Sequence, residues 1–266
     1  MNIPIFVINL PQSINRYDYM SDILEAKGLK YSFIEAVNGR AMSDDDVAEV
    51  CDQIKAKKVF GRELLLGEIG CALSHKKIYQ KIVDENIPYA VILEDDAIVK
   101  SDFKRVVSLV IEKNISYDVV LLGHNRGFKN EEVIDSVDSL WWRYLLNKNY
   151  RLGMLVKGGL GTYGYMISQK GAKRILEFLE CNSLYLPIDK ITANTDIVKV
   201  YGLLPVIITV AKQFDSLIEN TSFRGKDRDG ELIYEIAKMI KKTPFFDLTR
   251  SIWFAVLKIK PIKKYK

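Results

Sequence analysis

The sequence predicts an α/β protein with an open, mixed but mostly parallel sheet and helices on both faces. Short apolar runs alternate with segments of helical periodicity, and turn residues separate them. The chain has 266 residues, of which 48% are hydrophobic, so it can bury a sizeable core. In open sheets of this kind, ligands bind beyond the carboxyl ends of the strands. Functional residues are therefore expected where strands end.

The boundaries of the expected elements follow from turn and capping residues. Ser13, Ser43 and Ser168 suit helix N-caps, and Gly28 suits a helix end. After Asn125 the pattern loosens. The expected elements are strand 5–9, helix 13–28, strand 31–37, a short helix from Ser43, helix 67–83, strand 89–93, helix 101–113, strand 117–123, helix 168–179 and strand 203–211.

The net charge of +5 is concentrated at one end of the chain. Residues 241–266 hold eight basic residues and one acid, so they carry +7, and residues 1–240 carry −2. We assign 1–240 to one domain and 241–266 to a basic amphipathic tail. The tail fits either peripheral contact with an anionic membrane or a helix packed on the core. The body has no basic stripe with interleaved aromatics, so no nucleic-acid partner is expected.

Cysteine content and the N-terminal residues favour a cytoplasmic protein. Three scattered cysteines do not suggest a disulfide framework, and the first residues lack a basic leader. No window holds the roughly 20 apolar residues of a membrane span. We expect a cytoplasmic protein, peripheral on the inner face of the bacterial inner membrane if the tail binds lipid.

Three acidic residues, Glu94, Asp95 and Asp96, directly follow the strand expected at 89–93. Neighbouring carboxylates repel one another, and a divalent cation such as Mn²⁺ or Mg²⁺ can reconcile them. Alternation along an extended chain points Glu94 and Asp96 the same way and Asp95 oppositely. The alternative is a solvated acidic turn before the next helix.

Six segments in order resemble glycosyltransferase family 25, the bacterial lipooligosaccharide galactosyltransferases and their collagen-modifying relatives. They are "FVINLPQSINR", "FIEAVNG", "GEIGCALSHKKIYQ", "AVILEDDAIV", "GTYGYMISQKGAKRIL" and "LPID", with a weaker echo in "VAKQFDSLI". The resemblance implies the nucleotide-sugar-binding fold called GT-A, a UDP-sugar donor, a divalent metal, and a β-linkage formed from an α-linked donor. It also implies roles for individual residues.

The implied metal ligands are Asp96 and Glu94, with Asp95 or Glu94 contacting ribose or a metal-bound water. No histidine follows His124, so Gln213, Asp215 or water would complete the metal shell. The implied catalytic base is Asp189, with Asp196 in reserve, and helix capping is the alternative role for Asp189. The implied donor-binding residues, besides the three acids, are Val7, Asn9, Leu10, Arg16, Ser74, His75, Gly164 and Tyr165.

Several of these residues also fit structural roles. Arg16 can form an ion pair with Asp18 or Glu35 instead of binding the donor. The glycines of "GTYGY" suit a bulge or tight strand packing. Cys71 and His75 lie four residues apart on a helix, but two ligands without partners make a poor zinc site.

The expected reaction moves a hexose, galactose or glucose, from a UDP-sugar to a lipooligosaccharide, LPS or lipid-linked glycan acceptor. Two alternatives remain. An aspartate-nucleophile phosphohydrolase also carries acids after a strand, but it requires Asp where Glu94 stands, and Ala97–Ile98 fits its motif badly. A catalytically inactive glycan-binding relative is the other.

Overall fold

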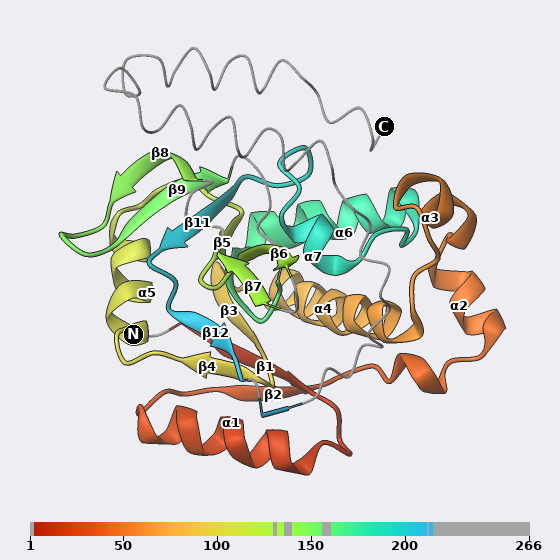
Figure 1. The fold of residues 1–266 in the computed structure, drawn as a ribbon, viewed down its shortest axis with the longest axis horizontal. Helices are drawn as coiled ribbons and strands as arrows, with labels where there is room; N and C mark the ends of the chain where they lie inside the picture. The colour runs from red at the N-terminus through yellow and green to blue at the C-terminus, as the bar shows by residue number, and fades with distance from the viewer. Residues whose placement is uncertain (1–2, 130–131, 136–139, 156–160, 212, 215–266) are drawn as a thin grey trace.

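The computed structural model describes residues 3–129, 132–135, 140–155, 161–211 and 213–214, and it confirms an α/β fold around a mixed sheet (Figure 1). The main sheet has eight strands among these residues. Their spatial order is β2 (Ser32–Glu35), β1 (Ile5–Asn9), β3 (Tyr89–Glu94), β10 (Gly164–Ser168), β5 (Val119–Leu121), β11 (Val200–Leu204), β9 (Arg151–Leu155) and β8 (Leu140–Leu145).

The sheet is mixed, because two of its eight strands run opposite to the other six. The pairs β1–β2, β1–β3 and β5–β11 are parallel, whereas β10 and β9 run antiparallel to their neighbours. The other strands of the sheet therefore share one direction. Two small antiparallel sheets accompany it, β4 (Ala97–Val99) with β12 (Ile208–Val210) and β6 (Asn125–Lys129) with β7 (Glu132–Asp135).

Helices cover both faces of the sheet, as predicted. The strand side chains separate into two buried clusters, one shared with α1 (Ile14–Ala26) and α5 (Phe103–Glu112), the other with α4 (Leu66–Asp84) and α6 (Gln169–Asn182). α7 (Ile188–Thr192) packs on α4. Within the described ranges, the remaining helices are η1 (Gly39–Ala41), α2 (Asp44–Val50) and α3 (Gln53–Val59). In the described part of the chain, no helix combines the length and the apolar character that crossing a bilayer requires.

Most predicted helix boundaries are confirmed. Ser43 forms a reciprocal capping box with Asp46, and the Ser168 hydroxyl accepts a hydrogen bond from the Gly171 N–H at 3.0 Å. Gly28 follows α1 with φ of 60°, a conformation that glycine adopts without strain. Ser13 does precede α1, but its side chain makes no capping hydrogen bond.

One prediction about the second half of the chain was wrong. The strand expected at 203–211 is divided into β11 and β12, because Pro205 has no N–H for the ladder. The segment after Asn125, where the sequence pattern loosens and no element was predicted before residue 168, contributes β6, β7, β8 and β9. The tail at 241–266 lies outside the described residues.

Candidate active site

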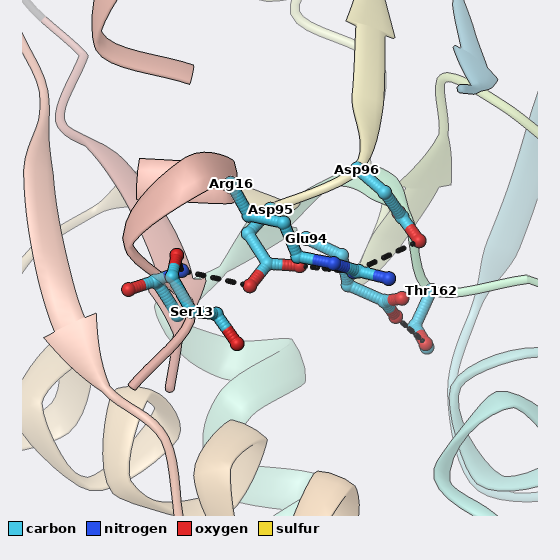
Figure 2. A network of polar contacts seen from close by, with 7 residues as sticks. Ser13, Arg16, Glu94, Asp95, Asp96 and Thr162 are labelled. Carbon is cyan, nitrogen blue, oxygen red and sulfur yellow. Dashed lines mark hydrogen bonds and ion pairs between the residues drawn. The ribbon is translucent and has the colours of Figure 1, made fainter. Parts of the chain in front are cut away.

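The three predicted acids lie where β3 ends, beside the N-terminal part of α1 (Figure 2). Glu94 is the last residue of β3, and Asp95 and Asp96 form the turn to β4. Glu94 contacts residues of α4 and of the segment before β10, whereas Asp95 contacts β1 and α1. Glu94 and Asp95 thus contact different elements. The predicted grouping of Glu94 with Asp96 is not confirmed, because Asp95 and Asp96 form a turn and both contact Arg16.

Asp95 is fixed by two partners from the first strand and helix. The Asn9 amide donates to its carboxylate at 2.8 Å, and the Arg16 guanidinium donates to it at 2.6 Å. Arg16 also lies 3.3 Å from the carboxylate of Asp96. Arg16 and Asp95 are both buried. Arg16 therefore pairs with Asp95 and Asp96, a partnership that the sequence did not indicate, since the ion pairs considered there were with Asp18 or Glu35.

Replacing Arg16 with glutamine should destabilise the fold by about 3–5 kcal/mol, because the buried carboxylate of Asp95 would lose its counter-charge. Urea unfolding followed by circular dichroism measures this change. Arg105→Gln is the matched control, since Arg105 pairs with Asp102 at the surface and such pairs contribute about 0–1 kcal/mol. Equal effects of the two substitutions would contradict a structural role for the Arg16 pair.

Asp96 has the features of a residue prepared for a cation. Its Oδ1 atom is buried and has no hydrogen-bond partner among the described residues. Burial, followed by the nearby charge of Glu94, raises the pKa of Asp96 to about 7. Among the described residues, Arg16 is the one Lys or Arg that contacts Asp95 and Asp96, so these two ionised carboxylates and that of Glu94 would leave a net charge of −2. These donors are oxygens, as Mn²⁺ and Mg²⁺ prefer, so the residues fit such an ion.

The raised pKa of Asp96 predicts how stability depends on pH. In metal-free protein, the folded state holds this proton more tightly than the unfolded chain, whose ordinary pKa is 3.8. Stability from this group is therefore present at low pH and is lost as the pH rises toward about 7. Asp96→Asn should melt at a higher temperature than the parent, and this difference should grow between about pH 4 and about pH 7.

The melting temperatures of Asp96→Asn and of the parent, measured in chelator at several pH values across this range, test the prediction. Asp196→Asn is the control, since Asp196 is exposed in the loop after α7. A melting-temperature difference between Asp96→Asn and the parent that stays constant with pH would contradict the prediction.

Glu94 is positioned by a line of buried side chains. The Thr162 hydroxyl donates to its Oε1 atom, and His75 Nε2 lies 3.8 Å from the same atom. On the other side of the ring, His75 Nδ1 bonds the hydroxyl of Tyr165 at 2.8 Å, which bonds that of Tyr79 at 2.6 Å. The sequence analysis indicated His75 and Tyr165 but assigned no role to Thr162 and Tyr79, although both lie within segments that resemble the family.

Asp189 lies in the first turn of α7, and Pro187 occupies the N-cap position. The alternative capping role for Asp189 is therefore wrong. Burial is the main cause that raises its pKa, and Glu68 and Glu94 raise it further. This effect of Glu94 means that the fold brings Asp189 within electrostatic reach of the β3 acids. Asp196, the reserve candidate, instead lines a separate open cavity beside α6 with Arg174.

The remaining predicted donor-binding residues are less accessible. Val7 and Tyr165 have no exposed surface, and the Ser74 hydroxyl is used by the Val37 N–H and the Gly70 carbonyl. A Cβ on Gly164 would lie 2.5 Å from the Ile208 side chain, so tight packing explains this glycine. Leu10 is partly exposed, and its carbonyl accepts from the Ser13 N–H. For Val7, Ser74 and Tyr165, direct donor contact would require the structure to rearrange.

Gln213 is exposed and adjoins Phe214, whose ring centroid lies 5.1 Å from the Arg16 guanidinium carbon. Gln213 is therefore the sequence neighbour of a residue that contacts Arg16. The role of Gln213 as a metal ligand stays a prediction. Asp215, the other candidate in this segment, lies outside the described residues.

Comparison with known proteins assigns residues 2–192 to a family profile described as glycosyltransferase family 25 (LPS biosynthesis protein). A glycosyltransferase 25 family member from Aedes aegypti is 31% identical over 194 residues, and procollagen galactosyltransferase 1-A from Xenopus laevis is 28% identical over 193. A probable inactive glycosyltransferase 25 family member 3 from Rattus norvegicus is 27% identical over 194. Each alignment covers 70% of this chain, but only 30–32% of the relative.

Similarities to solved structures are more distant. A glycosyltransferase involved in glycosylation of the major capsid of PBCV-1 matches with a TM-score of 0.38 and 10% identity, covering 75% of this chain and 80% of that one. The A197 protein from STIV matches with a TM-score of 0.40 and 14% identity, covering 83% and 99%. The fold assignment above therefore depends on the strand order of this chain itself.

Proposed function

The chain belongs to glycosyltransferase family 25, and on that premise we propose that it is an inverting, metal-dependent hexosyltransferase that uses a UDP-sugar. The observation that carries the proposal is the cluster at the end of β3. It holds three carboxylates, one arginine and a buried Asp96 oxygen without a hydrogen-bond partner among the described residues. Such a cluster has the charge and the donor atoms to hold a divalent cation.

Asp96 and Glu94 would hold the Mn²⁺ or Mg²⁺ ion. When bound, this ion supplies stabilisation of the negative charge that develops on the diphosphate as the glycosidic bond breaks. Asp95 is fully engaged by Asn9 and Arg16, so its contribution is to fix the turn from which Asp96 projects. The hydroxyl of Thr162 and the ring of His75 orient Glu94 from the opposite side.

Asp189 is the proposed general base. Inversion requires a group on the face opposite the leaving group to take the proton of the acceptor hydroxyl. The raised pKa of Asp189 gives its carboxylate more affinity for that proton than an exposed aspartate has. Its position on α7, separate from the β3 acids but electrostatically coupled to Glu94, suits a division between donor and acceptor sides.

The proposed donor is UDP-galactose or UDP-glucose, and the proposed acceptor is a lipooligosaccharide, LPS or lipid-linked glycan. Galactose is favoured by the printed names of relatives such as procollagen galactosyltransferase 1-A. The chain spans under a third of the length of the relatives compared above. A donor and an acceptor for this chain are therefore part of the proposal and do not follow from the names of those relatives.

Incubation with each UDP-sugar and Mn²⁺ tests the proposal. We expect UDP release that depends on the metal, favours one of the two sugars, and increases when a suitable glycan acceptor is added. Chelator should abolish the release. Binding of UDP-sugar without any release, in the presence of acceptors, would instead identify an inactive relative, as the name of the rat protein allows. Family membership argues against the phosphohydrolase alternative.

The tail at 241–266 supports a further part of the proposal, peripheral contact with an anionic membrane. Its charge of +7 and its apolar residues Trp253 and Phe254 suit a lipid surface. Removing the residues after Lys241 should abolish flotation with vesicles that contain anionic lipid. Unchanged flotation of the truncated chain would rule this contact out.

A further inference from the structure

Three side chains with metal-binding atoms meet on the α4 side of Glu94. The Cys71 sulfur, a ring nitrogen of His75 and a Glu94 oxygen lie within 4.8 Å of one another. Cys71 and His75 are one helical turn apart on α4, and β3 supplies the third residue. The sequence alone shows the first two without a partner, and the fold provides one.

The spacing of these atoms approaches that of a tetrahedral site. Zinc–ligand bonds of about 2.0–2.3 Å place neighbouring ligand atoms roughly 3.3–3.8 Å apart. His75 Nε2 and Glu94 Oε1 are 3.8 Å apart. A small rotation of the Cys71 and Glu94 side chains would therefore bring all three donors into range. The Glu94 side chain is 29% exposed and Cys71 is partly exposed, which leaves access for the ion and a water as fourth ligand.

His75 is prepared for a ligand that the described residues do not supply. The ring is completely buried, yet its Nε2 atom has no hydrogen-bond partner among them. Its Nδ1 atom is held by the Tyr165 hydroxyl, which Tyr79 holds in turn. With the proton on Nδ1, Nε2 presents its lone pair toward Cys71 and Glu94. Metal-binding histidines are commonly fixed in this way through the opposite nitrogen.

The ligand atoms on the two sides of Glu94 differ. Cys71 and His75 offer sulfur and nitrogen, whereas Asp96 offers oxygen. Thiolate and imidazole favour zinc, whereas carboxylates such as Asp96 suit Mn²⁺ or Mg²⁺. A thiolate and a carboxylate together also balance the charge of a divalent ion. Glu94 lies between the two sets, so an ion bound by Cys71 and His75 would engage the same carboxylate that the proposed catalytic ion needs.

We propose that Cys71, His75 and Glu94 form a zinc-binding site, and that zinc bound there withdraws Glu94 from the donor site and inhibits transfer. The second half rests on the proposed function, whereas the first half does not. Binding replaces the S–H bond of Cys71 with a sulfur–zinc bond, and the proton passes to the solvent.

Cobalt substitution tests binding without any activity measurement. The full chain, freed of metal and titrated with Co²⁺, should develop the near-ultraviolet charge-transfer absorption of a thiolate–cobalt bond, and zinc should abolish it. Cys71→Ser should remove this band and weaken zinc binding at least about 10-fold. Cys181→Ser, at an exposed cysteine on α6, should change neither. Cys71→Ala repeats the test if serine disturbs packing. A band that persists in both Cys71 variants would overturn the site.

Inhibition tests the second half. Micromolar zinc should suppress Mn²⁺-supported UDP release by the parent and by Cys181→Ser, and excess Mn²⁺ should partly restore it. Cys71→Ser should keep its basal release and resist zinc. Equal zinc sensitivity of Cys71→Ser and the parent would overturn the inhibitory role. If no UDP release is found at all, the proposed function fails, while the cobalt band still decides whether the zinc site exists.

Discussion

Asp96→Asn should reduce metal-dependent UDP release at least about 100-fold, because it removes the proposed direct metal ligand while preserving the shape of the side chain. The loss should appear in kcat and in the affinity for Mn²⁺ together. Isothermal titration with Mn²⁺ in the presence of UDP measures the second quantity, and a coupled assay of UDP release measures the first.

Two observations separate this loss from misfolding. In metal-free buffer near neutral pH, Asp96→Asn should be at least as stable as the parent, because the neutral amide avoids the buried charge that raises the pKa of Asp96. Asp196→Asn, on an exposed loop, should leave activity and metal affinity unchanged. Full metal dependence in Asp96→Asn would move the metal site away from this residue.

Asp189→Asn should retain UDP-sugar binding but lose about 10²–10⁴-fold in transfer, since an amide does not accept the proton of the acceptor hydroxyl. The affinity for donor, measured by equilibrium titration with UDP-sugar and Mn²⁺, should change little. Transfer to acceptor, measured by product formation in a single turnover, should show the loss.

The pH profile gives a second measurement for Asp189. In the parent, transfer should fall as the pH drops through the raised pKa of this carboxyl, because the protonated form no longer acts as a base. The residual transfer of Asp189→Asn should lack that acidic limb. Near-normal turnover of this variant would assign the base to another carboxylate, and loss of donor binding would make Asp189 a binding residue.

Local patterns in the sequence were sufficient for much of the fold and for the position of the acidic cluster at the end of a strand. Apolar runs and capping residues such as Ser43 and Ser168 identified most elements of the first half of the chain, since these signals act within a few residues. The acidic cluster was found because Glu94 directly follows an apolar strand. The strands after Asn125 were missed because their residues alternate weakly, and pairing with distant neighbours stabilises them.

Contacts between residues far apart in sequence were the part that could not be predicted. Arg16 and Asp95 are 79 residues apart, and Thr162 and Glu94 are 68 apart. A sequence read alone shows that the acids need a positive partner, but it does not show which helix supplies one. In the same way, Cys71 and His75 acquired a third donor only when the fold placed α4 against the end of β3.

The antiparallel strand β10 has a consequence for anyone who would re-engineer this protein. Its register against β3 places Tyr165 opposite Ile92, and the Tyr163 carbonyl accepts the Glu94 N–H, so Thr162 and Tyr165 reach Glu94 and His75 at once. A slip of one residue would reverse both side chains. The close fit of Gly164 against Ile208 opposes such a slip. Mutant libraries aimed at new sugar donors should therefore leave residues 162–166 unchanged, and should vary the surface around them instead.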